Sequence, residues 1–220
     1  MGRTALAIGG LVLISAGIAI GVGWWWPSTA EADHQVAGPV AGVRLDTASG
    51  DVRITARDVG TTSIHERFHY NGSRPDAAYR LDGTQLVLAG CGHDCIVDYE
   101  VVVPRGATVS GSSKSGDLLL EGVLGTDVTS NSGNVRVEDA AGPVRAHANS
   151  GDIEIGLASP QDVHADANSG DVTLTVPSDR YRVQARTNSG DQEIDVATDP
   201  AGPHLLDLEA NSGDVKVRHA

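Results

Sequence analysis

The sequence predicts an all-β fold: a β-solenoid, resembling a right-handed β-helix, with rungs of about 18 to 20 residues behind one N-terminal transmembrane helix. Three observations predict it. A Ser-Gly-Asp phrase recurs along the chain, the residues after each copy alternate between apolar and polar, and 27 Gly stand beside only three Trp, four Tyr and one Phe. A core of Val, Ile, Leu and Ala favours a thin, repetitive β architecture over an enzyme with a deep aromatic-lined pocket.

The overall charge narrows the class of partner. Among 220 residues there are 16 Lys and Arg against 29 Asp and Glu, which gives a formal net charge of -13. Such an acidic chain is not expected to bind nucleic acid. Its hydrophobic content of 40% is enough to build a core.

Residues 1–26 are predicted to be a cytoplasmic tip and a transmembrane anchor. The segment from Thr4 to Trp26 carries no charge, and a helix of that length spans roughly 34 Å, which is enough to cross a bilayer. Arg3 precedes it and marks the cytoplasmic side, while the Trp triplet at its end is typical of a membrane interface. We therefore expect residues 4–26 to bind the membrane as a single pass, with the C-terminal domain outside the cytoplasm.

The alternative is a secreted protein. Ala30-Glu31-Ala32 resembles a signal-peptidase site, and cleavage after Ala32 would release the rest of the chain. We favour the anchor, because the apolar run is longer than a signal peptide needs and ends in Trp. Residues 27–38 are then interpreted as a linker between the membrane and the exported domain.

Residues 110–220 contain the repeat that predicts the solenoid. Six copies of Ser-Gly-Asp or Ser-Gly-Asn follow one another at serine spacings of 17, 18, 19, 20 and 23 residues, and one more copy, Ser49-Gly50-Asp51, stands apart near the start. Each copy is followed by a strand of period two, such as Ile153-Glu154-Ile155, and a second short strand precedes the next copy. One repeat cannot bury its apolar side alone, so the repeats are expected to stack at about 4.8 Å per rung.

The phrase itself predicts the corner of each rung. Gly supplies a positive φ, and the Asn and Asp side chains can bond the backbone in Asx turns. We expect a structural corner ladder, with one row of Asn side chains. Its predicted members are Asn131, Asn149, Asn168, Asn188 and Asn211 together with Gly116, Gly133, Gly151, Gly170, Gly190 and Gly213.

Both ends of the rod depart from the regular pattern. Residues 39–109 are interpreted as an irregular β region that caps the N-terminal end, with a hairpin turn at Asp82-Gly83. At the other end the chain stops after the first strand of its last repeat. We expect that strand to be an exposed edge, protected from foreign strands by Lys216 and Arg218.

Residues 40–220 resemble a known family. The repeated Ser-Gly-Asp-Val phrase, the Cys91-Gly92-His93-Asp94-Cys95 segment and the strand at Asp98 to Pro104 are similar to a bacterial β-strand-repeat family of unknown function usually labelled putative adhesin. The resemblance implies an extracytoplasmic β-helix-like domain, often behind one membrane segment, with some relatives encoded beside envelope-stress systems. It supplies no catalytic residue. The sequence departs from the repeat at Asn134 and Gln192, which weakens any role that needs an unbroken row.

Cys91 and Cys95 are predicted to form a disulfide, because a close pair outside the cytoplasm is first interpreted as one. The alternative is a Cys-x-His-x-Cys metal site with His93 and Asp94. We favour the disulfide, because three ligands so close in sequence strain a tetrahedral site and thiols in an oxidising compartment tend to pair.

The aspartates that follow the corner glycines raise a second metal hypothesis. Stacked at one corner, Asp152, Asp171 and Asp191 are weak candidates for Ca²⁺. Asx turns already explain these residues, and Asn134 interrupts the row. We therefore predict no dedicated metal site and no cofactor.

The sequence does not indicate an enzyme. It lacks the G-x-S-x-G nucleophile motif and a phosphate-binding Gly loop before a helix. His147 and His164 fall on the outward side of neighbouring strands, where surface histidines are the ordinary interpretation. A carbohydrate-active enzyme remains a remote alternative.

The functional hypothesis is a non-catalytic, membrane-anchored interaction module outside the cytoplasm, similar to an adhesin. Its expected partner is an unidentified envelope protein or a cell-wall polymer, contacted through the exposed strands. The alternative is an accessory subunit of an envelope-stress sensing system.

Overall fold

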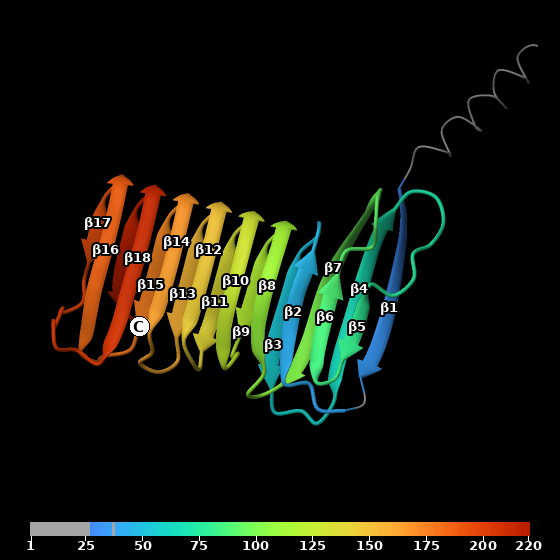
Figure 1. The fold of residues 1–220 in the computed structure, drawn as a ribbon, viewed down its shortest axis with the longest axis horizontal. Coiled ribbons are helices and arrows are strands. Elements are labelled where there is room, and N and C mark those ends of the chain that lie inside the picture. Colours follow the sequence, from blue (N-terminus) through green and yellow to red (C-terminus); the bar gives the residue numbers. More distant parts are fainter. Residues whose placement is uncertain (1–26, 37) are drawn as a thin grey trace, which may run out of the picture.

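The computed structural model describes residues 27–36 and 38–220, which form two long β-sheets facing each other (Figure 1). Sheet A has ten strands and sheet B has nine. In spatial order, sheet A contains β1 (Ser28–Val36), β4 (Thr62–Tyr70), β7 (Cys95–Pro104), β3 (Val52–Arg57), β9 (Leu118–Glu121), β11 (Val135–Ala140), β13 (Ile153–Leu157), β15 (Val172–Val176), β19 (Val215–His219) and β17 (Gln192–Ile194). Sheet B contains β16 (Tyr181–Ser189), β18 (His204–Ser212), β14 (Val163–Ser169), β12 (Val144–Ser150), β10 (Gly125–Ser132), β8 (Thr108–Ser115), β2 (Gly42–Thr47), β6 (Gln85–Ala89) and β5 (Tyr79–Asp82).

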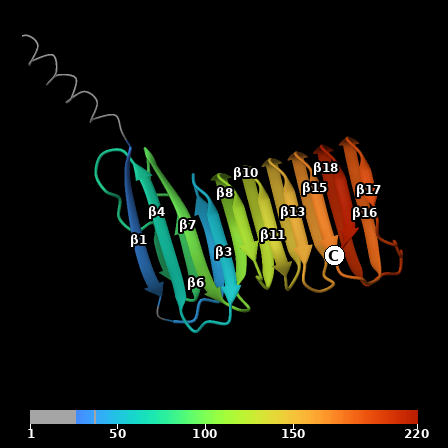
Figure 2. The same ribbon diagram turned by 180° about the vertical axis from the view of Figure 1, so that it is seen from behind.

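Most strand pairs are parallel, as in a solenoid. The chain alternates between the sheets, so that β10 and β11, or β12 and β13, form one rung, and the next rung stacks on it in register. Figure 2 shows the same stack from behind. The predicted all-β, solenoid-like rod is confirmed, while its right-handed turn stays a prediction.

The core lies between the sheets and is made of small aliphatic side chains. In the rung of β12 and β13, Val144, Ala146, Ala148, Ile153 and Ile155 are all buried. The large buried aromatic side chains lie towards the two ends of the rod, with Phe68 on β4, Tyr99 on β7 and Tyr181 on β16. Along the middle of the rod, most inward positions are filled by Val, Ile, Leu and Ala, and a few by small polar residues such as Ser113, Thr126 and Ser130, which is why so few aromatic residues suffice.

The first rung in the chain is not the first in space. The rung of β2 and β3 lies between the rung of β6 and β7 and the rung of β8 and β9. The Ser49-Gly50-Asp51 copy therefore joins the regular ladder: Asp117 N donates to Asp51 Oδ1 at 2.9 Å, and Asp51 N donates to Asp98 Oδ1 at 2.9 Å. Residues 39–109 are thus only partly a cap, because their first rung is internal.

The last rung in the chain is also internal. β18 pairs with β14 on one side and β16 on the other, and β19 lies between β15 and β17. The prediction that the final strand is an edge protected by Lys216 and Arg218 is wrong. The rung of β16 and β17 ends the rod, and there the inward position of Gln192 is exposed to solvent. This explains the departure of Gln192 from the repeat, because a polar side chain suits the solvent-facing end of a solenoid.

The residues interpreted as a linker form a strand. β1 pairs with β4 in antiparallel register from Ser28 to Val36, and its Ala30 and Ala32 pack against the core. Small and polar residues alternate along β1, which is compatible with a strand. The inward apolar residues are mostly alanine, so the segment is too weakly hydrophobic to be recognised as a strand from sequence. The cleavage alternative at Ala32 falls within this strand.

The anchor predicted for residues 1–26 lies outside the described residues. Between Pro27 and Ala220, leaving out residue 37, no helix is long and apolar enough to cross a membrane.

The antiparallel strands close the N-terminal end of the rod. The predicted hairpin is confirmed, with β5 and β6 paired around a turn in which Gly83 has φ 62°. The segment between β4 and β5 crosses this end, where the Arg74 Nη2 group donates to the Glu31 carbonyl at 3.1 Å.

Candidate functional site

One row of Asp and Asn side chains runs along the corner that precedes the sheet A strands. In each rung, a side-chain Oδ1 accepts the backbone N–H of the equivalent residue in the next rung, at 2.8 or 2.9 Å. In spatial order the row is Asp98, Asp51, Asp117, Asn134, Asp152, Asp171, Asp214 and Asp191.

This row has a structural role. Asn134 accepts the Asp152 N–H at 2.9 Å just as a carboxylate would, so the row of bonds is unbroken even though the row of charges is not. Of the three Ca²⁺ candidates, Asp152 and Asp171 are neighbours, but Asp214 stands between Asp171 and Asp191. In the described part of the chain, no group of three or more His, Cys, Asp or Glu side chains could hold a metal ion.

Substitutions of Asp171 distinguish the contribution of the carboxylate charge to stability from that of the hydrogen bond which the side chain accepts. Asp171→Asn is expected to leave the free energy of unfolding nearly unchanged, because the amide oxygen can still accept the Asp214 N–H. Asp171→Ala removes that acceptor and is expected to cost about 1 kcal/mol. Urea denaturation of both variants checks this. An equal loss for Asn and Ala would mean that the carboxylate charge matters instead.

The predicted glycines and asparagines lie at these corners. In the spatial order Asn131, Asn149, Asn168, Asn211 and Asn188, the Nδ2 group of each of the last four donates to the Oδ1 of the Asn before it at 2.7 to 3.3 Å. All of the predicted glycines have a positive φ, namely Gly116, Gly133, Gly151, Gly170, Gly190 and Gly213. A Cβ at any of them would lie under 3.0 Å from a carbonyl oxygen in an adjacent rung, which is closer than real Cβ atoms come.

The outer face of sheet A is acidic. Arg53, Lys216 and Arg218 point outward from this sheet, but they are outnumbered by the Asp row along its edge together with Glu100, Glu121, Glu138 and Glu154, which point outward from four of its strands. Arg136 is held by two of them, at 2.6 Å from Glu138 and 3.2 Å from Glu154. An anionic partner would be repelled from this face.

The outer face of sheet B has balanced charges. Its outward row across the rungs is Ser110, Asp127, Arg145, His164 and Asp207. Within this row, Arg145 Nη1 lies 3.8 Å from Asp127 Oδ2, and His164 Nδ1 lies 3.1 Å from Asp207 Oδ2.

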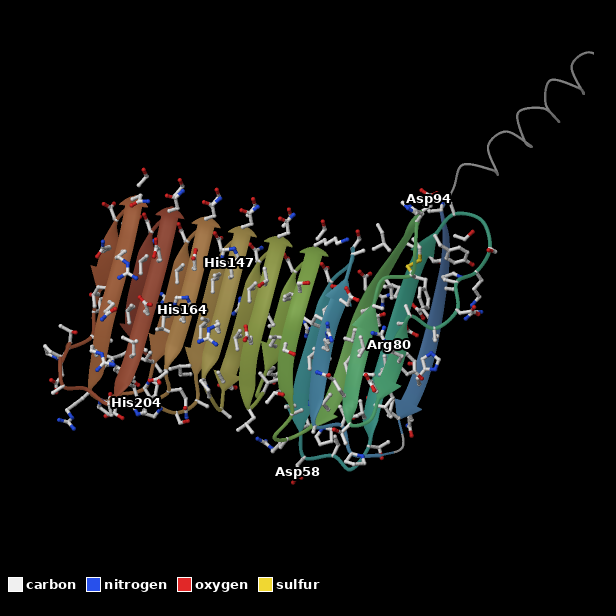
Figure 3. The ribbon with its side chains drawn as sticks, in the orientation of Figure 1. Asp58, Arg80, Asp94, His147, His164 and His204 are labelled. Atoms are coloured by element: carbon white, nitrogen blue, oxygen red, sulfur yellow. A yellow bond between two sulfur atoms is a disulfide. The ribbon has the colours of Figure 1, made fainter. Side chains whose placement is uncertain are left out.

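The histidines lie on this face as predicted from the alternation. Figure 3 shows His147 and His164 on the same broad face and His204 near its lower turns. The side chains of His147 and His164 are 45% and 49% exposed. His147 Nδ1 lies 3.7 Å from Asp166 Oδ1. Each of these two histidines therefore lies next to a carboxylate on the adjacent strand, as surface ion pairs in a sheet do.

A groove of about 740 Å³ runs along this face beside the row of charges. It crosses β8, β10, β12, β14 and β18, where these strands begin. Thr108, Gly125, Pro143, Asp162 and Leu205 line it next to the charged row, and the missing side chain at Gly125 leaves space over β10. The groove is shallow and extended, which suits a long ligand better than a small enclosed one.

Residues 38–218 match the family model described as Toastrack DUF4097. The chain belongs to the Toastrack DUF4097 family. The resemblance to bacterial putative adhesins is thereby confirmed. No curated protein matches the chain.

Two solved structures of other proteins have a fold similar to that of this Toastrack domain. A putative cell adhesion protein from Clostridium sporogenes is similar with a TM-score of 0.56 and 11% identity, covering 88% of this chain and 100% of that one. A putative adhesin from Bacteroides fragilis is similar with a TM-score of 0.52 and 12% identity, covering 89% and 99%.

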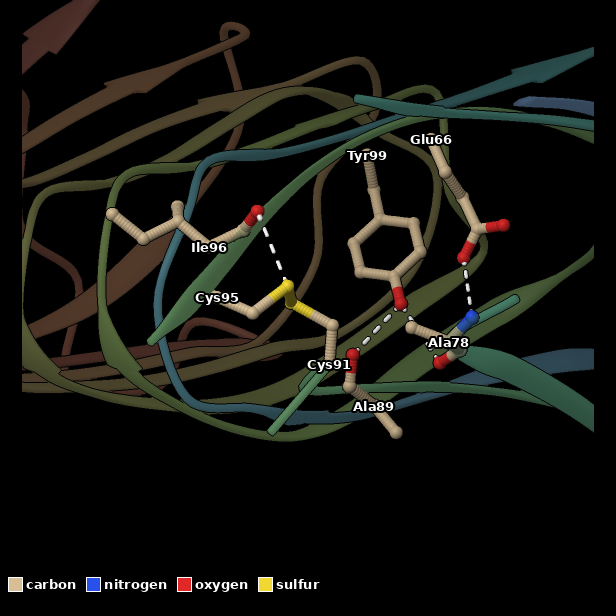
Figure 4. Close-up of a disulfide and its surroundings, with 7 residues drawn as sticks. All are labelled: Glu66, Ala78, Ala89, Cys91, Cys95, Ile96 and Tyr99. Atoms are coloured by element: carbon tan, nitrogen blue, oxygen red, sulfur yellow. Dashed lines mark hydrogen bonds between the residues drawn. A yellow bond between two sulfur atoms is a disulfide. The ribbon is translucent and has the colours of Figure 1, made fainter. Parts of the chain in front are cut away.

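The N-terminal end of the Toastrack domain contains a buried carboxyl group that sequence reasoning missed. Glu66 on β4 is fully buried, and its Oε1 accepts the Ala78 N–H at 2.8 Å (Figure 4). His34 Nε2 lies 3.1 Å from Glu66 Oε2, without the alignment of a hydrogen bond. The signal was present in the sequence, because Glu66 occupies an inward position between Ile64 and Phe68.

The same strand carries an H-E-x-x-H spacing, from His65 and Glu66 to His69, which sequence reasoning also missed. In zinc proteases this spacing needs a helix, where both histidines face one metal ion. On the strand β4 the two histidines are roughly 13 Å apart, and each is paired with its own carboxylate: His65 with Asp33 at 2.8 Å and His69 with Asp98 at 3.5 Å. Glu66 points to the opposite side, into the core. The spacing therefore forms no zinc site here.

A buried tyrosine completes the cluster around Glu66. The Tyr99 hydroxyl lies 2.8 Å from the Ala78 carbonyl oxygen and 2.7 Å from that of Ala89. Burial raises the pKa of Tyr99, and the nearby Glu66 raises it further. Burial also raises the pKa of Glu66 above its ordinary value of 4.5, although Ala78 N–H and His34 oppose this.

The raised pKa of Glu66 predicts a pH dependence of stability. A carboxyl whose pKa is higher in the folded state contributes its full stability below its unfolded value, and that contribution is lost as the pH rises through the folded pKa. Glu66→Gln keeps an oxygen that can accept the Ala78 N–H, but it cannot ionise, so the loss of stability at higher pH should disappear. Thermal unfolding from pH 4 to pH 8 should therefore show the E66Q protein gaining stability relative to the wild type as the pH rises. A difference that stays constant over this range would contradict a buried titrating carboxyl.

Cys91 and Cys95 form a disulfide at the turn between β6 and β7, with a Cα–Cα distance of 5.6 Å (Figure 4). Both sulfurs are used in this bond, so the Cys-x-His-x-Cys alternative has no thiolate to offer. His93 is exposed on the same turn.

Proposed function

We propose that this chain is a non-catalytic, membrane-anchored interaction module outside the cytoplasm, which contacts an envelope protein or a cell-wall polymer through the outer face of sheet B. The observation that carries the proposal is the groove across five strands of that face, with its row of paired charges. The names of the similar structures, which refer to adhesion, support the same class of function.

The two outer faces favour sheet B as the contact surface. The Asp row and the outward glutamates of sheet A would repel anionic partners and hold a layer of water and counterions. On sheet B, each outward charge of the row is already neutralised by a neighbour, so a partner need not bring a compensating charge.

A photo-crosslinking amino acid at position 164 tests the proposal in cells. Position 173, on the outer face of sheet A, serves as the matched control. Envelope material captured from position 164 and not from position 173 is the expected result, identified by mass spectrometry. Capture from position 173 alone, or equal capture from both, would contradict the choice of face.

The accessory-subunit alternative has one observation in its favour. β1 starts at Ser28, immediately after the predicted anchor, and is paired along its length with β4. A membrane helix in residues 4–26 would then be joined to the rod by a strand instead of a flexible stalk. One dominant membrane protein captured from position 164 would favour this alternative.

A further inference from the structure

We infer that the groove on the outer face of sheet B binds an extended, β-linked polysaccharide whose chain runs across the strands. The inference rests on the proposed function and names the class of ligand for the same face. It follows from the spacing, the chemistry and the shape of the groove.

The spacing of the groove is that of the rungs. Strands β8, β10, β12, β14 and β18 are hydrogen-bonded neighbours in register, so equivalent side chains recur roughly every 4.8 Å. One hexose unit in an extended β-linked chain has nearly this length. A chain laid along the groove therefore places one sugar over each rung. Successive sugars of an extended β-1,4-linked chain present opposite faces, so equivalent hydroxyl groups recur at every second rung.

The chemistry of the row suits hydroxyl groups. Sugar hydroxyls both donate and accept hydrogen bonds, and the row offers acceptors at Asp127 and Asp207 and a donor at Arg145. Asp207 is held in place by His164 at 3.1 Å and by Arg186 Nη2 at 2.9 Å, and its side chain is only 21% exposed. A carboxylate fixed in this way loses little side-chain entropy when it accepts a bond from a ligand.

The shape of the groove suits a chain and not a single sugar. Pro143 and Leu205 provide apolar contacts for the C–H groups of a sugar ring, but none of the described residues that line the groove is Phe, Trp or Tyr. Each sugar is therefore held weakly. A measurable affinity therefore requires several sugars of one chain to bind at the same time, so the affinity should depend on the length of the chain.

Titration calorimetry of the full-length chain with β-1,4-linked N-acetylglucosamine oligomers of increasing length tests the inference. Because the groove crosses five strands, affinity should rise with each added unit and level off at about five units. Oligomers of α-1,4-linked glucose, which coil, should bind much more weakly.

Two glycine variants locate the binding. A Cβ at Gly125 would lie 3.6 Å from Thr108 Cγ2 and 3.8 Å from the Pro143 carbonyl oxygen, so a larger residue fits there without strain. Gly125→Gln places a side chain in the groove and should weaken binding at least tenfold, which is about 1.4 kcal/mol. Gly156→Gln on the outer face of sheet A, where a Cβ would lie 3.9 Å from the Val137 carbonyl oxygen, should leave binding unchanged.

The outcomes separate this inference from the proposed function. Length-dependent binding that only Gly125→Gln removes would support both. If no β-linked oligomer binds, or if Gly125→Gln has no effect on binding, the inference is wrong. The proposed function would still stand if position 164 captures an envelope protein in cells, and it would fall together with the inference if position 164 captures nothing specific.

Discussion

Val217→Asp is expected to lower the free energy of unfolding by more than about 4 kcal/mol, and Ile194→Asp by much less. The two residues are register partners in neighbouring rungs. Val217 is 1% exposed because β19 lies between β15 and β17, whereas Ile194 belongs to the end rung and is partly exposed. A carboxylate at position 217 would be buried without a partner, while one at position 194 can reach water.

Urea denaturation of the two variants beside the wild type measures this difference. The result tests the spatial order of the last two rungs, because an order that follows the chain would make Val217 the exposed position. A larger loss for Ile194→Asp than for Val217→Asp would show that β18 and β19 end the rod.

Gly133→Ala is the second substitution with a large expected effect, a loss of more than about 3 kcal/mol. Gly133 has φ 135°, and a Cβ there would lie under 3.0 Å from the Gly116 carbonyl oxygen. The alanine can be accommodated only if two stacked corners move apart, which would weaken the backbone bonds between them. The variant should also lose protection from amide exchange in β10 and β11.

Gly72→Ala is the control for conformation alone. Gly72 also has a positive φ, 92°, but a Cβ there would meet no atom within 4 Å. Gly72→Ala should lower the free energy of unfolding by only about 1 to 2 kcal/mol, which is the cost of holding an alanine in the left-handed conformation. Similar losses at both positions would mean that the corners are not in close contact and that only the backbone conformation matters.

The regular part of the fold could be predicted because each rung carries its own signals. Period-two alternation sets which side chains are buried, and the glycine after each serine fixes the corner. Neither signal says which rung lies next to which, since all of them offer equivalent edges. The order at both ends was therefore missed, although the exposed Gln192 and the longer spacing before Ser212 are local traces of it.

The N-terminal end was the least predictable region for a different physical reason. β1 is stabilised by its pairing with β4, which is distant in sequence, and its own residues are mostly small or polar. Glu66 is tolerated in the core only because Ala78 and His34 come from other elements to meet it. The alternation of β4 marks Glu66 as inward, but the partners that make a buried carboxyl tolerable depend on tertiary structure and leave little trace in a local pattern.

Of the candidate site, the sequence predicted the outward position of His164 but not the groove. The groove depends on the register that brings Gly125, Pro143, Asp162 and Leu205 side by side where four successive strands of sheet B begin. In the sequence they are separate turn and strand-start residues with no common motif.

Hydroxyl-radical footprinting of the full-length chain, with and without isolated envelope material, tests the central claim that the outer face of sheet B is the contact surface. Pro143, His164 and Leu205 line the groove, while Leu119 lies on the outer face of sheet A. Envelope material is expected to reduce labelling of Pro143, His164 and Leu205 and to leave labelling of Leu119 unchanged. Reduced labelling at Leu119 with no change at the groove would contradict the claim.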